Sequence, residues 1–340
     1  MSDSKAFIAG CFGHRLTAEE RDFFAAERPW GFILFGRNIG SAQQVADLVA
    51  ELKEAGGRPT TPVFVDQEGG RVQRLRPPLA PNYPPAADLG RLHETDAPAA
   101  QRAAWLQGRL IAHDLAGYGF NADCLPCLDV PAPGAHSVIG SRAYSPDPAI
   151  AATLGRAAAD GLRAGGLLPV MKHIPGHGRG NADSHLEMPV VEASFGELEA
   201  SDFRPFVELR SLPAAMTAHL LYRAIDPERP ATLSPVVIDT VIRGAIGFEG
   251  LLMSDDMSMK ALRGDIGDLS RAALQAGCDL ALHCNGDMDE MKKVAHAAPP
   301  LAGAALRRAE AAEQIIADGG EPADEPALRA EFHALIADLV

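Results

Sequence analysis

Eight short apolar runs recur along the chain, and most are followed by a segment with helical periodicity. The runs cover residues 5–11, 31–36, 62–65, 120–130, 166–171, 214–220, 250–253 and 278–284. Most are apolar at consecutive positions and not only at every second one, which is typical of strands buried on both faces of a parallel sheet. Alternation of such strands with helices predicts an α/β fold.

Helices are expected between these runs, and several begin at a recognisable cap. The predicted helices cover residues 41–54, 99–117, 147–164, 194–209 and 234–244, and a tail rich in Ala, Glu and Arg follows the last strand. Ser41 is a suitable N-cap residue. Pro148 after Asp147, and Pro235 after Ser234, stand at the first helical position that proline favours.

Repeated strand–helix units fit a closed (β/α)8 barrel of the TIM type. Such barrels typically need about 250 residues, so a chain of 340 residues has room for additional helices at its two ends. A doubly wound sheet is the alternative, but Gly10-Cys11-Phe12-Gly13 is a poor match to the glycine-rich first turn of that fold. No internal repeat and no flexible linker divides the chain, and we expect a single domain over residues 1–340.

Composition and charge narrow the possible partners. The formal net charge is −14, and the 31 Lys and Arg residues form no basic run, which argues against nucleic acid or an anionic membrane as a partner. The chain has no apolar leader after a basic segment and no run of 18 apolar residues, which predicts a soluble cytoplasmic protein. We expect a monomer whose partner is a small neutral or cationic molecule.

The cysteines predict buried thiols and not redox chemistry. There are five of them, at Cys11, Cys124, Cys127, Cys278 and Cys284, an odd number in a chain for which no export is expected. Cys124 and Cys127 have the spacing of a redox motif. They lie inside an apolar stretch, however, and not at the start of a helix after a strand, so plain buried thiols are the preferred interpretation.

The most informative stretch is residues 172–185, Lys-His-Ile-Pro-Gly-His-Gly-Arg-Gly-Asn-Ala-Asp-Ser-His, directly after the apolar run at 166–171. Three glycines, Gly176, Gly178 and Gly180, exclude regular structure and allow unusual backbone angles. Ordinary connections of about 2–6 residues would join the same elements. A longer loop that carries so many ionisable groups therefore indicates function.

Ionisable residues also collect wherever a predicted strand ends. They are Asp66, Arg74, Arg142, Lys172, His173, His219, Asp255 and Asp256. In a barrel these strand ends meet at one rim, which is where active sites lie. A purely structural explanation would require several unrelated buried charges, each of which destabilises the fold unless it is paired. The pattern therefore predicts an active site at the C-terminal rim of the barrel.

Two reaction classes fit these residue types. His173, His177, His185 and His219, with nearby aspartates, could hold a divalent ion that activates water. Alternatively, a strand-end carboxylate such as Asp255 could attack a sugar carbon while a second group supplies and removes the proton. The histidines lack a compact His-x-His or His-Glu-x-x-His spacing on a rigid element. The glycosidase therefore ranks first and the metal-dependent hydrolase second.

Several longer motifs narrow this choice. They are Gly31-Phe32-Ile33-Leu34-Phe35, Val65-Asp66-Gln67-Glu68-Gly69-Gly70-Arg71-Val72-Gln73-Arg74, Ile139-Gly140-Ser141-Arg142, Lys172-His173-Ile174-Pro175-Gly176-His177-Gly178 with Asp183-Ser184-His185, and Ser254-Asp255-Asp256 after an apolar strand. Together they resemble glycoside hydrolase family 3, specifically its single-domain bacterial β-N-acetylglucosaminidases of cell-wall recycling. The resemblance covers about residues 30 to 285.

The resemblance implies a (β/α)8 barrel, retention of configuration, and neither cofactor nor metal. It implies Asp255 as the nucleophile and Asp183 with His185 as a mobile acid/base pair. The implied sugar-binding residues are Asp66, Arg74, Arg142, Lys172 and His173. The implied reaction removes non-reducing terminal N-acetylglucosamine (GlcNAc) from peptidoglycan-derived fragments, namely GlcNAc-1,6-anhydroMurNAc and its peptides.

Some neighbouring residues have a structural interpretation. Asp256 should be structural, because adjacent residues of a strand face opposite ways and only one can face the barrel axis. His177 is expected to order its loop, with a direct role as the alternative. Glu68 is expected to order the loop from Asp66 to Arg74. The chain departs from the family at Ile174, where phenylalanine is usual, and at the two cysteines of the apolar stretch, and neither departure touches the chemistry.

Overall fold

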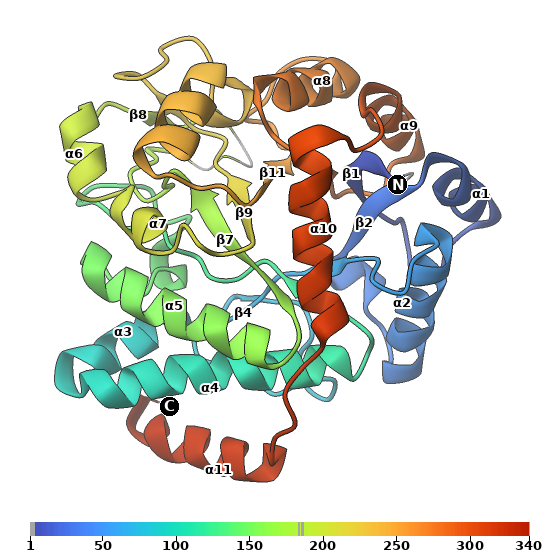
Figure 1. The fold of residues 1–340 in the computed structure, drawn as a ribbon. Helices are drawn as coiled ribbons and strands as arrows, with labels where there is room; N and C mark the ends of the chain where they lie inside the picture. Colours follow the sequence, from blue (N-terminus) through green and yellow to red (C-terminus); the bar gives the residue numbers. More distant parts are fainter. Residues whose placement is uncertain (1–3, 183, 185–186, 340) are drawn as a thin grey trace.

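The core of the computed structural model, which describes residues 4–182, 184 and 187–339, is a closed barrel of eight strands (Figure 1). The strands pair in parallel in the order β1-β12-β11-β9-β7-β6-β3-β2. They are β1 (Lys5–Gly10), β2 (Pro29–Leu34), β3 (Val63–Val65), β6 (Ala122–Asp123), β7 (Leu168–Ile174), β9 (Ala214–Thr217), β11 (Leu251–Asp256) and β12 (Leu280–His283). Each of the eight apolar runs contains one strand, so the predicted (β/α)8 barrel is confirmed.

Helices surround the barrel on its outside (Figure 1). They are α1 (Ala18–Glu27), α2 (Ala42–Gly56), α3 (Ala86–Thr95), α4 (Ala97–Ala116), α5 (Pro148–Ala164), α6 (Phe195–Ala200), α7 (Arg204–Glu208), the π-helix η4 (Val237–Ala245), α8 (Ile266–Ala276) and α9 (Met288–Ala297). Short 3-10 turns occur at η1 (Gly36–Asn38), η2 (Gly140–Arg142), η3 (Ala231–Leu233) and η5 (Ala337–Leu339). None of the helices in the described part of the chain is long and apolar enough to cross a membrane.

Two helices near the C-terminal end of the chain are additions to the barrel, as predicted, whereas at the other end β1 begins at Lys5 and no helix precedes it among the described residues. α10 (Gly303–Asp318) runs across the N-terminal end of the strands (Figure 1). Its Glu313 accepts hydrogen bonds from Trp30, at the start of β2, and from Thr60, before β3. α11 (Glu325–Leu335) lies against α4 (Figure 1). The base of the barrel is thereby covered, and the opposite rim is left for the loops that follow the strands.

Two predicted elements are shorter than the sequence pattern suggested. The run at 120–130 forms only the two-residue β6, because Pro126 has no N–H to donate and interrupts the ladder; beyond it one bridge joins Cys127 to Lys172. The helix expected at 194–209 is two helices, α6 and α7. Pro205 lacks the N–H that would bond to the carbonyl of Ser201, so it interrupts a continuous helix but is tolerated in a first turn, and α7 accordingly begins at Arg204.

Two small sheets lie outside the barrel, in the loops at its C-terminal rim. β4 (Gln67–Gly69) and β5 (Val72–Gln73) pair antiparallel directly after β3. β8 (Val190–Val191) and β10 (Leu221–Tyr222) pair in parallel. These pairs fold the segments after β3, β7 and β9 into ordered structure next to the strand ends.

Candidate active site

A cavity of about 310 Å³ lies at the C-terminal ends of the strands. The described residues that were predicted to form the site all line it: Asp66, Arg74, Arg142, Lys172, His173 and Asp255. They come from the segment after β3, from η2, from the end of β7 and from the end of β11. The other two predicted residues, Asp183 and His185, lie outside the described residues. Segments far apart in the sequence thus contribute to one cavity, as their position at strand ends predicted.

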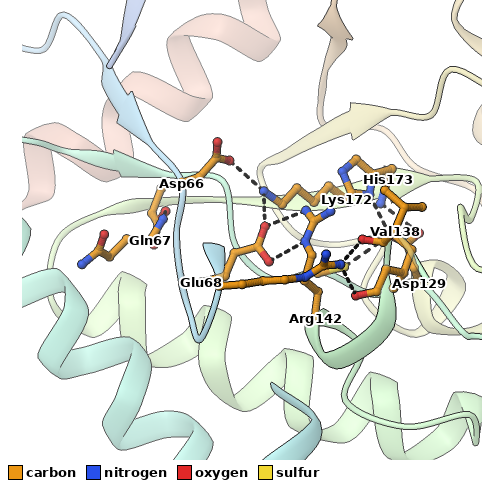
Figure 2. Close-up of polar contacts among 12 residues, drawn as sticks. Asp66, Gln67, Glu68, Asp129, Val138, Arg142, Lys172 and His173 are labelled. Carbon is orange, nitrogen blue, oxygen red and sulfur yellow. Dashed lines mark hydrogen bonds and ion pairs between the residues drawn. The ribbon is translucent and has the colours of Figure 1, made fainter. Parts of the chain in front are cut away.

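Lys172 is the centre of an ionic cluster at one side of this cavity (Figure 2). Its Nζ lies 2.8 Å from Oδ1 of Asp66 and 2.6 Å from Oε1 of Glu68. Arg142 binds Glu68 with two nitrogens, Nε to Oε2 at 2.8 Å and Nη2 to Oε1 at 2.7 Å. Arg74 donates from Nη2 to Oδ2 of Asp66 at 2.8 Å. Charge-assisted and bidentate contacts of this kind fix side chains strongly.

The cluster stays ionised although it is buried. Burial alone would raise the pKa of Asp66, but Lys172 and Arg74 overcome this effect and hold that pKa well below its usual range. In the same way burial opposes ionisation of Glu68, and Arg142 with Lys172 lowers its pKa. Burial would lower the pKa of Lys172, whereas the two carboxylates raise it. The cavity wall therefore offers fixed charged donors and acceptors that suit the hydroxyl and amide groups of a sugar.

Asp129 orients His173, the next residue of the cavity wall. Its wholly buried carboxylate lies 2.6 Å from Nδ1 of His173. It also accepts from the backbone N–H of His173 at 3.2 Å and from that of His177 at 2.6 Å. Burial would raise the pKa of Asp129, but the two histidines lower it. Because Nδ1 is used in this contact, Nε2 is the ring nitrogen of His173 that can bind a ligand in the cavity.

Asp255, like the neighbouring Asp256, is a carboxylate of the cavity wall that forms no ion pair with a described residue. At the end of β11 it accepts a hydrogen bond from the N–H of Asp256 at 2.8 Å, and no ion pair joins it to any described residue. Burial would raise its pKa, but nearby His219 and His173, this N–H and Lys172 lower the pKa below its usual value. Asp255 is therefore an ionised carboxylate held at a fixed place, as a nucleophile needs to be.

Asp256 and His219 support the segment that follows β11. The Asp256 carboxylate accepts from N and Oγ of Ser258, at 3.0 and 2.7 Å, and from the N–H of Cys284 at 3.2 Å. These bonds suit the structural role expected of it, although the side chain also lines the cavity. His219 contacts Oγ1 of Thr232 at 2.8 Å and the carbonyl of Asp256 at 3.0 Å. Both of its ring nitrogens therefore have protein partners.

His177 and Ser184 tie the glycine-rich loop to the rest of the rim. The ring Nε2 of His177 lies 3.2 Å from Oγ of Ser184. The carbonyl of Ser184, in turn, accepts from the N–H of Ala261, a few residues after β11, at 3.1 Å. Burial and the neighbouring His173 lower the pKa of His177 to about 4, so its imidazole is neutral near pH 7. The loop is thereby fixed next to the segment that follows Asp255.

With this geometry established, comparison with known proteins identifies the family. The model of the glycosyl hydrolase family 3 N terminal domain matches residues 9–316. The chain belongs to glycosyl hydrolase family 3. It is 39% identical over 277 residues to a beta-hexosaminidase of Aromatoleum aromaticum, which covers 80% of this chain and 77% of that protein. It is 40% identical over 277 residues to the beta-hexosaminidase of Methylococcus capsulatus, with 80% of each chain covered.

Solved structures agree with this result. NagZ from Neisseria gonorrhoeae in complex with N-trifluoroacetyl-D-glucosamine superposes with a TM-score of 0.87 and 32% identity, and 98% of each chain is covered. A family 3 β-N-acetylglucosaminidase from a Paenibacillus species gives a TM-score of 0.85 at 29% identity, covering 97% of this chain and 66% of that one. The family 3 protein described here is accordingly a glycoside hydrolase of the β-N-acetylhexosaminidase type with β-N-acetylglucosaminidase activity.

One group of residues in this family 3 enzyme has the ligand types of a metal site. Among the described residues only Cys127, Asp129 and His173 bring three such ligand atoms close together. Asp129 contacts the Cys127 thiol at 3.2 Å as well as the ring of His173. Because its two oxygens already take four hydrogen bonds, the group is explained as support for His173. The other histidines of the metal alternative, His177 and His219, do not join it, and His185 is outside the described residues.

The five cysteines are all buried and without disulfides, as the sequence analysis expected. Burial raises the pKa of the Cys124 and Cys127 thiols well above its usual value. Burial therefore disfavours the thiolate form that redox chemistry needs, which agrees with their interpretation as plain buried thiols.

Sequence reasoning missed several residues of the cavity wall and its support. Asp129 was assigned only to a strand, and its role in holding His173 depends on a contact across 44 positions of sequence. Apolar wall residues such as Ile33, Met216 and Leu282 lie inside strands, where a sequence pattern cannot separate them from the core. Phe35 directly follows β2, and its place at a strand end is the signal that could have found it.

Proposed function

We propose that this enzyme is a retaining exo-β-N-acetylglucosaminidase of peptidoglycan-derived fragments, GlcNAc-1,6-anhydroMurNAc and its peptides. The observation that carries the proposal is one ionised carboxylate, Asp255, in a cavity whose wall holds fixed hydrogen-bonding groups. A cavity near 310 Å³ is at the small end of ligand sites, which span about 300–1,000 Å³. This size favours one terminal sugar over a long stretch of polysaccharide. The monomeric state, the single domain and the cytoplasmic location stay predictions.

The sugar-binding roles follow from the charges of the cavity wall. Arg142, Lys172 and His173 supply donors, and Asp66 supplies acceptors, for hydroxyl groups and the N-acetyl carbonyl. Arg74 holds Asp66 in place and still has an unpartnered buried Nε among the described atoms. A solved relative binds N-trifluoroacetyl-D-glucosamine, which supports an N-acetylglucosamine-like sugar at this position.

Asp255 would act as the nucleophile of a double displacement. Its carboxylate attacks the anomeric carbon as the bond to the leaving oxygen breaks, which gives a covalent glycosyl-aspartate. Water then attacks the same carbon and releases Asp255, so the configuration is retained. Asp66 and Glu68 are bound to cations with lowered pKa values, and neither is a suitable proton donor. The second catalytic group is therefore expected elsewhere.

His185 with Asp183 is the proposed acid/base pair. An imidazole has an ordinary pKa near 6.5, so it can donate and accept protons at cytoplasmic pH without the raised pKa that a carboxylic acid would need. Asp183 would accept a hydrogen bond from one ring nitrogen and stabilise the protonated form. Ser184 lies between the two in sequence, and it is hydrogen-bonded to His177 and to Ala261, a residue that follows Asp255 in the chain.

The mechanism is tested by trapping the glycosyl enzyme. A 5-fluoro N-acetylglucosaminide with a good leaving group should add one sugar to the intact mass of the wild-type enzyme. Peptide mapping should find the sugar on Asp255, and Asp255→Asn should give no adduct. Turnover without any adduct, together with release of the α-anomer in an NMR time course, would refute the covalent mechanism. An adduct lost in Asp256→Asn but kept in Asp255→Asn would move the nucleophile by one residue.

Sugar specificity is tested separately. A site built to bind the N-acetyl group rejects an analogue that leaves buried polar groups unpaired, by up to about 10⁴-fold. We therefore expect 4-nitrophenyl N-acetyl-β-glucosaminide to be cleaved far better than the plain β-glucoside. Similar kcat/KM values for the two would contradict the assignment of the sugar.

A further inference from the structure

Arg71 is the cation of the cavity wall that the proposed mechanism does not use. Its side chain is exposed and lines the cavity. One nitrogen, Nη2, donates to the carbonyls of Ser137 at 3.2 Å and Ile139 at 3.1 Å, and to that of Val138. These contacts fasten the guanidinium to the segment just before Arg142. They hold the charge at a fixed place without neutralising it.

Arg71 differs from the other cations around the cavity in having no anionic partner. Arg74 and Lys172 are paired with Asp66, and Arg142 with Glu68. For Arg71, no ion pair exists with any residue that the structure describes, and its Nε and Nη1 make no hydrogen bond there. An exposed guanidinium that is held by one nitrogen presents its remaining donors to a ligand, and these donors match a carboxylate.

We propose that Arg71 binds a carboxylate on the aglycone, and so makes the enzyme selective for anionic leaving groups. The inference rests on the proposed exo action, in which the terminal sugar occupies the buried part of the cavity. Lys172 and His173 there are 2% and 6% exposed, whereas Arg71 is exposed. A group bonded to C1 of the sugar would extend past Asp255 toward the opening, where Arg71 is the unpaired charge.

This inference differs from the expectation of a neutral or cationic ligand, which stays a prediction. A formal net charge of −14 repels anions at long range, but charges separated by more than the Debye length of about 8 Å are largely screened at physiological ionic strength. Local contacts therefore decide binding in the cavity. A fixed, unpaired guanidinium can select an anion there although the whole protein is acidic.

The test measures kcat/KM on two substrates that differ only in one charge. These are GlcNAc-1,6-anhydroMurNAc with its free lactyl carboxylate and the same disaccharide with that group converted to the methylamide. We expect Arg71→Gln to lower kcat/KM about fivefold or more on the acid and to leave the amide nearly unchanged. Arg71→Lys should retain part of the preference for the acid, and added salt should weaken it in the wild type.

The matched control is Arg76→Gln on the same loop. Arg76 is exposed, donates to the carbonyl of Gly70 at 2.8 Å, and does not line the cavity. This variant removes one positive charge nearby, so it should keep the ratio between acid and amide substrates. A similar change of that ratio in Arg76→Gln would mean that general charge, and not Arg71, sets the preference.

Equal losses on acid and amide in Arg71→Gln would overturn the proposal and reduce Arg71 to a clamp for the loop before Arg142. No loss on either substrate would also overturn it. If the wild type cleaves 4-nitrophenyl N-acetyl-β-glucosaminide but neither disaccharide, the proposed natural substrate fails. Arg71 is then tested with 4-carboxyphenyl and 4-carbamoylphenyl N-acetyl-β-glucosaminides, comparing the ratio of wild type to variant on each. A carboxylate-selective loss supports the proposal, and equal ratios refute it.

Discussion

Two clusters of buried charge lie at opposite ends of the barrel and differ in how completely they are satisfied. The rim cluster, at the C-terminal strand ends, consists of Asp66, Glu68, Arg74, Arg142 and Lys172. The base cluster, at the N-terminal ends, consists of Arg243, Asp279 and Arg308. Both contain buried carboxylates paired with cations. Only the rim cluster contributes to the wall of the cavity.

In the base cluster, the charged groups are paired with other groups of the protein. The carboxylate of Asp279 accepts from Arg243 at 3.1 Å, from Arg308 at 3.1 Å and from the N–H of Leu252 at 2.9 Å. Arg243 also donates to the carbonyls of Phe248 and Gly250. None of the base cluster's side-chain atoms is among the buried unpartnered atoms found in the described residues. These contacts join η4 and α10 to the starts of β11 and β12. The base cluster therefore stabilises the fold.

The rim cluster, in contrast, contains a hydrogen-bond donor that has no partner among the described atoms. The Nε of Arg74 is buried without a partner among the described atoms, and Asp66, the carboxylate that joins Arg74 to Lys172, lines the cavity. A buried polar atom left unpaired destabilises a protein, so the arrangement makes sense when a ligand completes it. Buried charge is present in both clusters. What distinguishes the binding cluster from the structural one is that one of its hydrogen-bonding groups lacks a partner among the described residues.

The largest expected effect is the loss of activity when the nucleophile at the rim is replaced, with little change in the stability of the fold. Asp255→Asn should lower kcat by at least about 10⁴-fold, as loss of a nucleophile does in other enzymes. The free energy of unfolding should change by less than about 1 kcal/mol, because asparagine can still accept the single hydrogen bond from Asp256. Steady-state kinetics and urea denaturation measure the two effects. Near-normal turnover, or a large loss of stability, would contradict the conclusion that the rim serves activity and the base serves stability.

The next effect concerns the acid/base on the rim loop. His185→Ala should lower the rate of glycosylation of the disaccharide by about 10²-fold or more, because a sugar alcohol leaves only when it is protonated. A nitrophenyl glycoside should lose much less, since its leaving group is stable as an anion. Single-turnover measurements on both substrates isolate this step. Equal losses on the two would show that His185 is not the acid and would direct attention to His177.

The base cluster should give the opposite pattern. Asp279→Ala leaves two buried guanidinium groups without their anion and should lower the free energy of unfolding by about 3 kcal/mol or more. kcat measured well below the melting temperature should stay that of the wild type. Glu249→Ala is the control, since this exposed residue pairs with the same Arg308 and should change stability by less than about 1 kcal/mol. A loss of kcat in folded Asp279→Ala would mean that the two ends are coupled.

The contrast between the two ends also explains what the sequence could predict. Strand ends at the C-terminal rim carried Asp66, Lys172, His173 and Asp255, and barrel topology alone brings such positions to one side. The partners of these residues could not be read from the chain in the same way. Glu68 was expected only to order its own loop, but it also binds two cations from other segments. Which charges pair depends on side-chain distances that no local pattern contains.

Some predicted boundaries of helices and strands were wrong for a similar reason. The pattern at 120–130 is mostly apolar and therefore predicted one strand, although Pro126 within it, which interrupts regular pairing, is visible in the sequence. The base cluster drew no attention, because Arg243, Asp279 and Arg308 are spread over a helix, a strand start and a terminal helix. Only the folded chain brings them together.

The last expected effect is confined to the pH dependence of stability and concerns Asp123, a carboxyl group next to the rim cluster that forms no ion pair with a described residue. It is fully buried, accepts from the N–H of Gln67 at 3.0 Å, and has an unpartnered Oδ2 among the described atoms. Burial is the main cause that raises its pKa from the ordinary 3.8 to about 8. Between these two values the folded protein keeps a proton that the unfolded chain releases. Stability should therefore fall as pH rises across this window, with a slope of at most about 1.4 kcal/mol per pH unit.

Asp123→Asn, which is always neutral and can still accept from Gln67, should remove this part of the slope and become more stable than wild type as the pH approaches 8. Urea denaturation at a series of pH values measures the difference, with Asp22→Asn, an exposed carboxylate on α1, as the control. Parallel curves for wild type and Asp123→Asn would show that Asp123 is ionised, and that the rim cations stabilise even a carboxylate they do not contact.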